Sequence, residues 1–399
     1  MKLDSERVAP AGLYVHIPFC RRKCPYCDFY SISDVSLIPA FLQALQREMQ
    51  MLRPVPLAFD TLYLGGGTPS VLGADNIGQI MEGVRRCFTI RPAAEITVEV
   101  NPGTAGFEQL KAYRAHGVNR LSIGVQSFQE AHLNFLGRIH SGRDGRRVFE
   151  GARRAGCDNI GIDLIYGLPG QSIPSWRLDL QQAVDLQPEH LSCYMLTFES
   201  GTPMGKDLRR GRVRRPDEAR VRELFDTTVD FLDSHGYVQY EISNFARAAA
   251  PNGVPQFSRH NQKYWHFAPY LGLGPAAHSF IEPQRSWNHR RVQTYIRDLE
   301  AGRLPRAAQE VLTAEQLMIE AIYLGLRTID GIDLAGFQQR FGFSFVQAFQ
   351  EVIVDLAGRG LIQTARQRCA LTRAGLAYLD SITAMFTSYE LSSAVPLGR

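Results

Sequence analysis

Three cysteines in a short run are the residues of this chain best suited to chemistry. Cys20, Cys24 and Cys27 lie in the segment CRRKCPYCDF, directly after an apolar run that predicts a strand. Three thiolates on one loop can each bind one iron of a cubane iron–sulfur cluster, which leaves the fourth iron open to a substrate or cofactor. The basic residues between the first two cysteines, from Arg21 to Lys23, favour the thiolate form and offset the negative charge of a cluster.

Zinc is the alternative interpretation of this cysteine cluster. A structural zinc site normally has four protein ligands, and a second Cys or His pair usually completes the set. The other cysteines (Cys87, Cys157, Cys193 and Cys369) are scattered through apolar stretches, where a cysteine is typically a small buried hydrophobe. The sequence contains no second pair, so an iron–sulfur cluster is favoured.

Polar or side-chain-free residues end several other predicted strands. The run LGGGTP, residues 64–69, follows the second strand, and its glycines permit close approach of a ligand, although a tight turn would explain them equally well. Glu99, Gln126 and Asp163 each end a run rich in Val, Ile and Leu, and Arg138 follows the fourth strand. These side chains are candidates to face a site, with a satisfied loop hydrogen bond as the alternative for each.

Short apolar runs alternate with amphipathic stretches in the first half of the chain. The runs predict strands over 13–16, 61–64, 96–100, 120–125, 159–165 and 190–196. The stretches between them predict helices over 36–52, 74–88, 107–116, 145–155 and 175–186. This alternation is typical of an α/β fold with a parallel sheet, and six units predict a partial (β/α)6 TIM-type barrel. In such barrels the chemistry takes place at the carboxyl ends of the strands.

The pattern changes after about residue 215. A long helix is predicted over 217–235, and a loop-like stretch follows from Ala248 to Ser258. Residues 313–386 predict three helices and then a short β pair around Ile362 and Leu371. We expect two domains, residues 1–295 and residues 296–399. The second is small, mainly helical and similar to a winged helix, with a role in partner docking or as a lid.

Composition and charge exclude several classes of protein. The chain has 399 residues, is 45% hydrophobic and carries 44 basic against 40 acidic residues, which gives a net charge of +4. This composition is globular, and the nearly even balance of charge gives no support to a nucleic-acid partner. No segment approaches the roughly 18 consecutive apolar residues of a membrane span, and the N-terminus lacks the apolar core of a signal peptide. We therefore expect a cytoplasmic protein that is not integral to a membrane.

The spacing Cys-x-x-x-Cys-x-x-Cys resembles the signature of the radical S-adenosylmethionine (SAM) superfamily. In that superfamily the open iron binds the amino and carboxylate groups of SAM, and reduction of the cluster cleaves SAM to a 5′-deoxyadenosyl radical. Five blocks further resemble, in order, those of the oxygen-independent coproporphyrinogen oxidase family. They are YVHIPFC (14–20), GGGTP (65–69), EVNP (99–102), GVQSF (124–128) and DLIYGLP (163–169).

This resemblance, which covers about residues 12 to 290 and more weakly the rest, implies a set of cofactor contacts. The [4Fe–4S] cluster would be held by Cys20, Cys24 and Cys27. The residues that would contact SAM are Tyr14, Tyr26, Gly66, Gly67, Thr68, Glu99, Gln126, Arg138 and Asp163. Glu99 and Asp163 suit the ribose hydroxyls or the amine, because carboxylates accept such donors.

The segment HNQKYW, residues 260–265, resembles a motif of the heme-binding branch of this family. An imidazole can ligate heme iron, and Tyr and Trp offer flat apolar faces to a porphyrin. The resemblance implies heme contact by His260, Tyr264 and Trp265, within an extension of the first domain. The alternative is a packed aromatic segment with a hydrogen-bonded histidine. His278 resembles the same branch and would line the site without being the chosen iron ligand.

Two departures from the oxidases bear on function. The oxidases carry a further cysteine two residues after the third ligand, where this chain has Phe29, and a longer N-terminal segment contributes to their active site, whereas 19 residues precede Cys20 here. Our first hypothesis is a heme chaperone that uses its cluster and SAM to pass heme to an acceptor protein, with membrane-associated acceptors among the candidates. The second is a coproporphyrinogen III oxidase that forms protoporphyrinogen IX. The third is a radical methyltransferase, or a binding module without radical chemistry.

Overall fold

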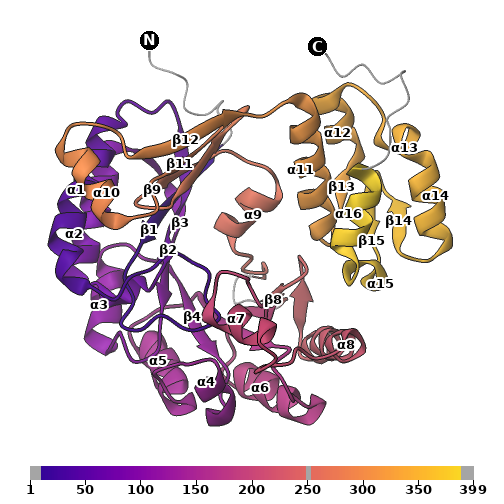
Figure 1. The fold of residues 1–399 in the computed structure, drawn as a ribbon, viewed down its shortest axis with the longest axis horizontal. Coiled ribbons are helices and arrows are strands. Elements are labelled where there is room, and N and C mark those ends of the chain that lie inside the picture. Colours follow the sequence, from indigo (N-terminus) through magenta and orange to yellow (C-terminus); the bar gives the residue numbers. More distant parts are fainter. Residues whose placement is uncertain (1–9, 249–252, 388–399) are drawn as a thin grey trace.

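The computed structural model describes residues 10–248 and 253–387. The N-terminal stretch up to residue 9, and residues 249–252 of the predicted loop between Ala248 and Ser258, lie outside the described residues. The chain builds one large sheet covered by helices and then a smaller, mainly helical unit (Figure 1). Among the described residues, no helix is both long and apolar enough to cross a membrane.

Six parallel strands form the centre of the large sheet. They are β1 (Ala11–Ile17), β2 (Ala58–Gly66), β3 (Thr89–Val100), β4 (Arg120–Gln126), β5 (Ile160–Tyr166) and β6 (His190–Met195). Each strand pairs with the next, and all six predicted strands are present. Within the described residues the sheet has the order β12-β11-β10-β9-β1-β2-β3-β4-β5-β6-β8-β7. Because its edges are β12 and β7, the barrel stays open, and the predicted α/β class with a partial barrel is confirmed.

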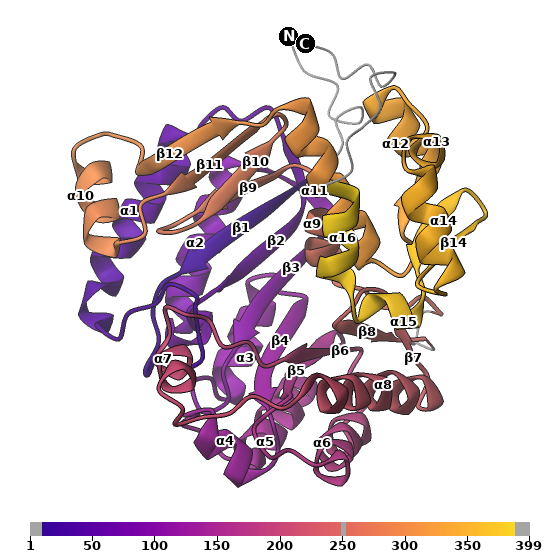
Figure 2. The ribbon, with the colours of Figure 1, turned by 45° about the vertical axis from the view of Figure 1, so that its right-hand side comes forward.

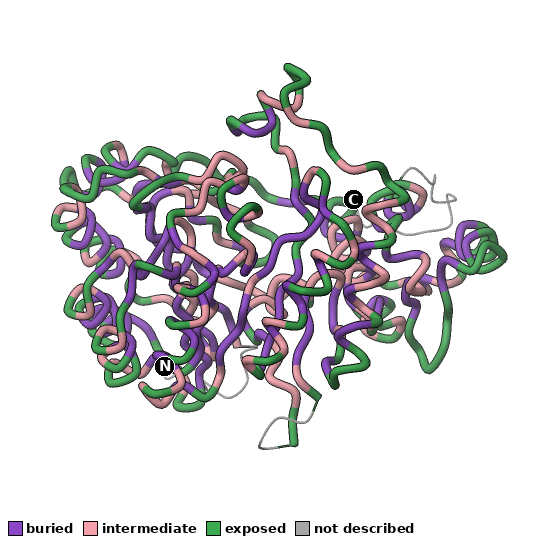
Figure 3. Tube along the Cα trace, turned by 90° about the horizontal axis from the view of Figure 1, so that it is seen from below, coloured by how far each residue is buried: buried purple, intermediate pink, exposed green. Residues whose placement is uncertain are grey.

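Helices cover the outer face of these strands. They are α1 (Ile38–Met51), α2 (Ala74–Cys87), α3 (Phe107–Ala115), α4 (Glu130–Phe135), α5 (Gly142–Arg154) and α6 (Ile173–Asp185), with short 3-10 turns η1 (Val35–Leu37) and η2 (Pro69–Val71). On β1 the residues Leu13, Val15 and Ile17 are fully buried, while the alternate residue Tyr14 is half-buried. Since side chains of a strand alternate between faces, one face packs on the helices and the other is left to form a site. Figure 3 shows the buried segments through the middle of the molecule.

The chain extends the sheet on both sides. The elements of this extension are α7 (Pro203–Arg209), α8 (Glu218–Ser234), β7 (Tyr237–Gln239), β8 (Asn244–Arg247), α9 (Arg259–Trp265), β9 (Tyr270–Leu273), β10 (His278–Ile281), β11 (Gln284–Asn288), α10 (Val292–Glu300) and β12 (Arg306–Val311). β9 pairs in parallel with β1, and β10 to β12 continue the sheet as antiparallel strands (Figure 2). The sequence predicted α8 and missed β9 to β12, because these strands are short and lack a clear alternation.

The small unit follows β12. It contains α11 (Ala314–Arg327), β13 (Ile332–Asp333), α12 (Leu334–Phe341), α13 (Phe345–Ala348), α14 (Gln350–Gly358), β14 (Ile362–Ala365), β15 (Arg368–Leu371), α15 (Arg373–Leu376) and α16 (Leu379–Thr387). The predicted β pair is the β14–β15 hairpin, in which Ile362 faces Leu371. Residues 295 and 296, where the sequence divides the chain, lie inside α10, and β12 still belongs to the large sheet. We propose to place the division after β12.

Candidate cofactor site and adjoining pocket

The cysteine loop follows β1 and is held against the end of β2. The Cys20 N–H donates to the Ile32 carbonyl at 2.9 Å, and the Cys27 N–H donates to the Cys24 carbonyl at 3.2 Å. The Cys20 thiol lies 3.2 Å from the Thr68 hydroxyl. These bonds fold the loop at the carboxyl ends of the strands, where a barrel of this class has its site.

The three thiols fit a cluster better than a single ion. Burial raises the pKa of the Cys27 thiol, and the nearby Cys24 and Cys20 add to that rise, as expected where three thiolates gather. Within the described residues, no three His, Cys, Asp or Glu side chains converge on one metal ion. A cubane cluster takes each thiolate on a different iron, so its ligands need not converge.

Arg138 connects the cysteine loop to the strand ends. Its guanidinium lies 3.6 Å from the Cys24 sulfur and 3.4 Å from the Tyr26 hydroxyl, and it donates at 2.7 Å to the Asn101 amide oxygen and to the Gly124 carbonyl. The Arg138 Nε is buried and has no hydrogen-bond partner in the described part of the chain. This open donor suits a carboxylate. Asn101 was not singled out from the sequence, although it stands two residues after Glu99 in the EVNP block.

The glycine run after β2 packs against the cysteine loop. The Gly67 N–H donates to the Ile17 carbonyl and the Thr68 N–H to the Phe19 carbonyl, both at 2.8 Å. A Cβ on Gly67 would lie 2.7 Å from the Phe19 oxygen, so only glycine fits there. The glycines of this run therefore allow two segments of this chain to pack closely: the run itself and the cysteine loop.

Two half-buried carboxyl groups stand close enough for their charges to interact. Glu99 accepts from the Tyr63 hydroxyl at 2.9 Å and from the Gly66 N–H at 3.0 Å. Burial raises the pKa of Glu99 to about 7, and the charge of Asp163 contributes. Asp163 accepts from the Ser122 hydroxyl at 3.0 Å, and burial raises its pKa as well. Such a pair offers acceptors for the hydroxyl or amine donors of a ligand.

Gln126 ends β4 in a strained conformation. Its φ is 68°, in the left-handed region that residues other than glycine rarely adopt. The β4–β5 pairing changes register between Ile123 and Gln126. A Cβ on Gly124 would lie only 2.9 Å from the Gln126 amide nitrogen, so the glycine makes room for this side chain. Strain of this kind beside Arg138 is typical of a functional site.

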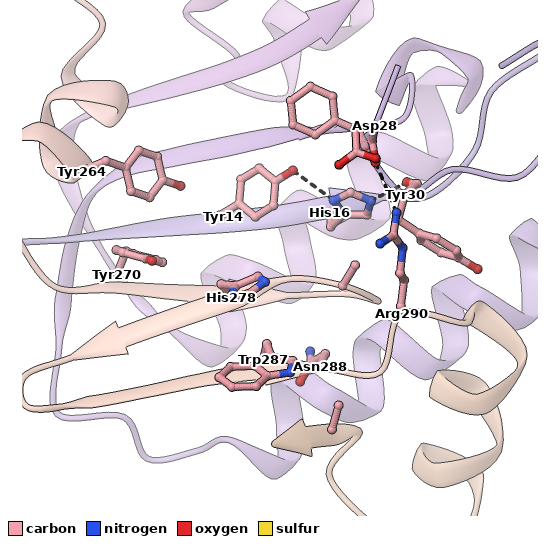
Figure 4. Close-up of a pocket in the computed structure, with 13 residues that line it drawn as sticks. Tyr14, His16, Asp28, Tyr30, Tyr264, Tyr270, His278, Trp287, Asn288 and Arg290 are labelled. Carbon is pink, nitrogen blue, oxygen red and sulfur yellow. Dashed lines mark hydrogen bonds between the residues drawn. The ribbon is translucent and has the colours of Figure 1, made fainter. Parts of the chain in front are cut away.

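A pocket of about 580 Å³ opens beside the cysteine loop (Figure 4). It is lined mainly by aromatic and histidine side chains: Tyr14, His16, Asp28, Phe29, Tyr30, Tyr264, Tyr270, Ala276, His278, Trp287, Asn288, Arg290 and Ala307. One wall, residues 28–30, directly follows Cys27, and the wall formed by Tyr270, His278 and Trp287 comes from β9 to β11. Its volume is in the range of small-molecule sites. The loop that carries the cysteines thus also shapes the pocket.

The HNQKYW segment lies in α9, and its three candidate heme residues lie in three different environments. His260 is 1% exposed, and its ring nitrogens lie 2.8 Å from the Thr61 hydroxyl and 2.9 Å from the Tyr264 hydroxyl. Burial lowers the pKa of His260 to about 3. Tyr264 lines the pocket, whereas Trp265 is not among the lining residues and packs under the Arg327 guanidinium at 4.4 Å. The structure therefore brings only Tyr264 of the three predicted heme residues to the pocket, and His278 lies there instead.

Two family models match this chain. Residues 14–182 match the radical SAM superfamily, and residues 312–378 match the HemN C-terminal domain. Together with the three-cysteine loop and the open parallel sheet, these matches define a radical SAM protein. Membership of that superfamily implies a [4Fe–4S] cluster and SAM as cofactors.

Curated relatives cover nearly the whole chain. Heme chaperone HemW of Bacillus subtilis is 36% identical over 91% of this chain and 95% of its own length. HemW of Mycobacterium tuberculosis is 34% identical over 94% of both. The mitochondrial radical S-adenosyl methionine domain-containing protein 1 of Danio rerio is 34% identical over 96% of this chain and 87% of its own. The chain therefore belongs to the HemW family.

A solved structure shares the fold. Coproporphyrinogen III oxidase (HemN) from Escherichia coli superposes with a TM-score of 0.82 over 96% of this chain and 91% of that one, at 24% sequence identity. The match includes the small C-terminal unit as well as the open barrel.

Proposed function

We propose that the protein is a heme chaperone, which binds heme and passes it to an acceptor protein. The pocket beside the cysteine loop carries this proposal, because its aromatic rings offer the flat apolar surface that a porphyrin needs. Phe29, at the position where the oxidases have a further cysteine, is 68% exposed in that pocket. The heme-chaperone names of the relatives support the same assignment.

The cysteine loop beside the pocket would hold the cofactors that support this function. Cys20, Cys24 and Cys27 would hold the cluster, which supplies an electron when reduced. Arg138 would bind the SAM carboxylate through its open Nε, and the Glu99 and Asp163 side chains would accept from the ribose hydroxyls or the amine. Tyr14, Tyr26, Gln126 and the glycine run would complete the walls. In this arrangement the chain would orient the cofactor beside the pocket.

Coproporphyrinogen III oxidation is the second candidate, and the shared fold with HemN favours it. We place it second because Phe29 replaces the oxidases' further cysteine. The reconstituted protein should be incubated anaerobically with coproporphyrinogen III, SAM and a reductant, with HemN as the positive control. We expect no protoporphyrinogen from this chain, and heme added instead should co-elute with the protein in gel filtration. Protoporphyrinogen formation without heme retention would return the oxidase to first place.

The acceptor belongs to the same proposal. We infer that it is a protein, and that the small C-terminal unit is the part that docks it, since this unit lies beside the pocket-forming extension (Figure 1). A cytoplasmic location and the lack of a nucleic-acid partner stay predictions from composition and charge.

A further inference from the structure

Among the described residues, His16 and His278 line the pocket, and His260 lies behind the lining residue Tyr264. His16 and His260 are fully engaged. The ring of His16 is bonded at 3.1 Å to the Tyr14 hydroxyl and at 2.9 Å to the Tyr30 carbonyl. Both ring nitrogens of His260 are likewise in hydrogen bonds, and that ring is buried. Either histidine could bind iron only after one of these bonds is broken, which costs free energy in a buried site.

His278 is the third histidine, and it is exposed to the pocket. In the described part of the chain, no hydrogen bond reaches either of its ring nitrogens. Its ring stacks on Trp287, with centroids 5.7 Å apart and planes at 24°, because the two residues face each other across the β10–β11 pair. Burial and the nearby Arg285 lower the pKa of His278, which favours the neutral imidazole that a metal ion binds.

We propose that His278, rather than His260, is the axial ligand of heme in this pocket, with Trp287 supporting the ring of His278. The proposal rests on the proposed function. Figure 4 shows His278 near the middle of the pocket, with Tyr264 and Tyr270 toward one end and Arg290 toward the other. An iron bound there would centre the macrocycle over the aromatic lining.

Arg290 supplies the charge that a heme propionate needs. It is exposed, donates to the Asp28 carbonyl at 3.2 Å, and lies 5.8 Å over the ring of Tyr30. A backbone carbonyl does not neutralise a guanidinium, so Arg290 can pair with a carboxylate of the ligand, although the Asp28 carboxyl also lines the pocket. The pocket therefore combines an imidazole, flat apolar walls and a cation at its rim.

The segment before His278 is fixed in place, as a ligand-bearing segment should be. The Gly274 N–H donates to the Glu48 carboxylate at 2.8 Å, and the Asn288 amide donates to the Gly274 carbonyl at 2.9 Å. Ala276 has a φ of 62°, in the left-handed region, and its N–H donates to the His289 carbonyl at 3.1 Å. Rigid support of this kind holds a metal-binding side chain in one orientation. His260, in contrast, positions Tyr264 in the pocket wall.

The test is a comparison of heme complexes of the cluster-reconstituted protein by absorbance and electron paramagnetic resonance. The variants are His278→Ala, His278→Met, His260→Gln and, as a matched control, His266→Ala, which removes an exposed histidine outside the pocket. We expect His278→Ala to shift the Soret band and weaken heme binding at least tenfold. Added imidazole should restore the wild-type spectrum. His278→Met should keep heme with a different ligand spectrum. His260→Gln, which disturbs the support of Tyr264, should keep the wild-type ligand spectrum even where the affinity for heme falls, and His266→Ala should keep both.

Two results would overturn the inference. One is a wild-type ligand spectrum in His278→Ala; the other is loss of that spectrum in a folded His260→Gln protein. A wild-type protein that takes up no heme would overturn both the proposed function and this inference. A spectral change confined to one variant bears on this inference alone, so the two failures can be told apart. Thermal unfolding of each variant shows that the fold is intact.

Discussion

At the scale of single residues, what matters is which polar atoms remain open to a ligand. Arg138 uses both terminal nitrogens within the protein, Nη2 toward Asn101 and Gly124 and Nη1 toward the cysteine loop, and leaves Nε buried and unpaired among the described residues. His278 leaves both ring nitrogens open there, whereas His260 leaves neither. A buried donor without a partner is costly unless a ligand supplies one, so the Arg138 Nε marks a place where a ligand is expected. The exposed His278 ring carries no such cost, but it is open to a ligand without breaking a bond within the protein.

The proposed cluster ligands give the first prediction. Cys24→Ala removes one thiolate, and we expect the reconstituted protein to lose most of its cluster and to stop cleaving SAM, because a cubane held by two cysteines is labile. Iron content and 5′-deoxyadenosine formation measure both effects. Cys87→Ala is the matched control, since Cys87 is a small buried hydrophobe of the core. Equal loss in both variants would speak against the assignment.

Glu99 gives a prediction on pH. Because the pKa of Glu99 is about 7, its carboxyl is mostly protonated at pH 6 and mostly ionised at pH 8. The ionised form is the better acceptor for a cationic or hydroxyl-bearing ligand, so SAM affinity should rise with pH through about 7, by up to roughly tenfold per unit below the pKa. Glu99→Gln should bind SAM more weakly and remove this rise. Calorimetric titration at several pH values measures it, and parallel profiles for the two proteins would refute the role.

Much of the candidate cofactor site could be proposed from residue types and spacing, and the assignment of its residues stays a prediction. The types and spacing of Cys20, Cys24, Cys27, Glu99 and Asp163 carry a chemical signal. The structure places the cysteines on the loop after β1, Glu99 next to the last residue of β3 and Asp163 in the middle of β5. The sequence carries no such signal for the direction in which a side chain points. His260 and His278 both lie in plausible motifs. The packing of α9 on β2 engages the His260 ring in hydrogen bonds, whereas the β10–β11 register leaves the His278 ring open.

At the scale of elements, one carboxyl group joins three segments. Glu48 of α1 is 1% exposed and accepts from the Gly274 N–H at 2.8 Å, from the Tyr295 hydroxyl at 2.6 Å and from the Asn288 amide. Tyr295 lies on α10 and Asn288 ends β11. This clamp holds the segment that leads to His278 against the helical layer, so the pocket wall depends on it.

Glu48→Gln tests the clamp through the pH dependence of stability. Burial raises the pKa of Glu48 to about 7 from the ordinary 4.5, so between these values the folded state holds a proton that the unfolded state has lost. Wild-type stability should therefore fall as pH rises from about 4.5 to about 7, by roughly 3 kcal/mol in total. The stability of the Glu48→Gln variant should not fall over this range. Its free energy of unfolding should therefore increase relative to that of the wild type as pH rises. Urea unfolding at several pH values measures it. The exposed carboxylate Glu82 is the control, and Glu82→Gln should run parallel to the wild type.

Elements were predictable where they are long and periodic. The six parallel strands and the helices α1, α2, α3, α5, α6 and α8 follow from apolar runs and helical spacing. β9 to β12 were missed because three of them have only four or five residues and depend on pairing with β1 and one another. Since these strands form one wall of the pocket, the shape of the pocket could not be foreseen.

At the scale of the whole molecule, the small unit is tied to the barrel by charged contacts. Arg327 of α11 pairs at 2.8 Å with Glu241, which is fully buried, and its guanidinium covers Trp265. Trp265 thus lies at the contact between the barrel and the small unit. The HNQKYW motif alone does not indicate this role. The small unit and the pocket wall are joined through α9.

Arg327→Met tests this contact. Removal of the cation leaves Glu241 unpaired in a buried place, and we expect a loss of about 3–5 kcal/mol in the free energy of unfolding. The control is Arg359→Met, because the Arg359–Asp355 pair is more than half exposed and should contribute less than about 1 kcal/mol. Chemical denaturation of both variants decides the point. Similar small effects would mean that the pair does not hold the units together.

The measurement that tests the central claim most directly is an anaerobic heme titration of the cluster-reconstituted wild-type protein, followed by absorbance. The account predicts saturable uptake that ends at one heme per chain, with a Soret band typical of an imidazole-ligated iron. Uptake that never saturates, or none at all, would contradict the assignment of the pocket to heme and leave the protein as a radical SAM protein of another purpose.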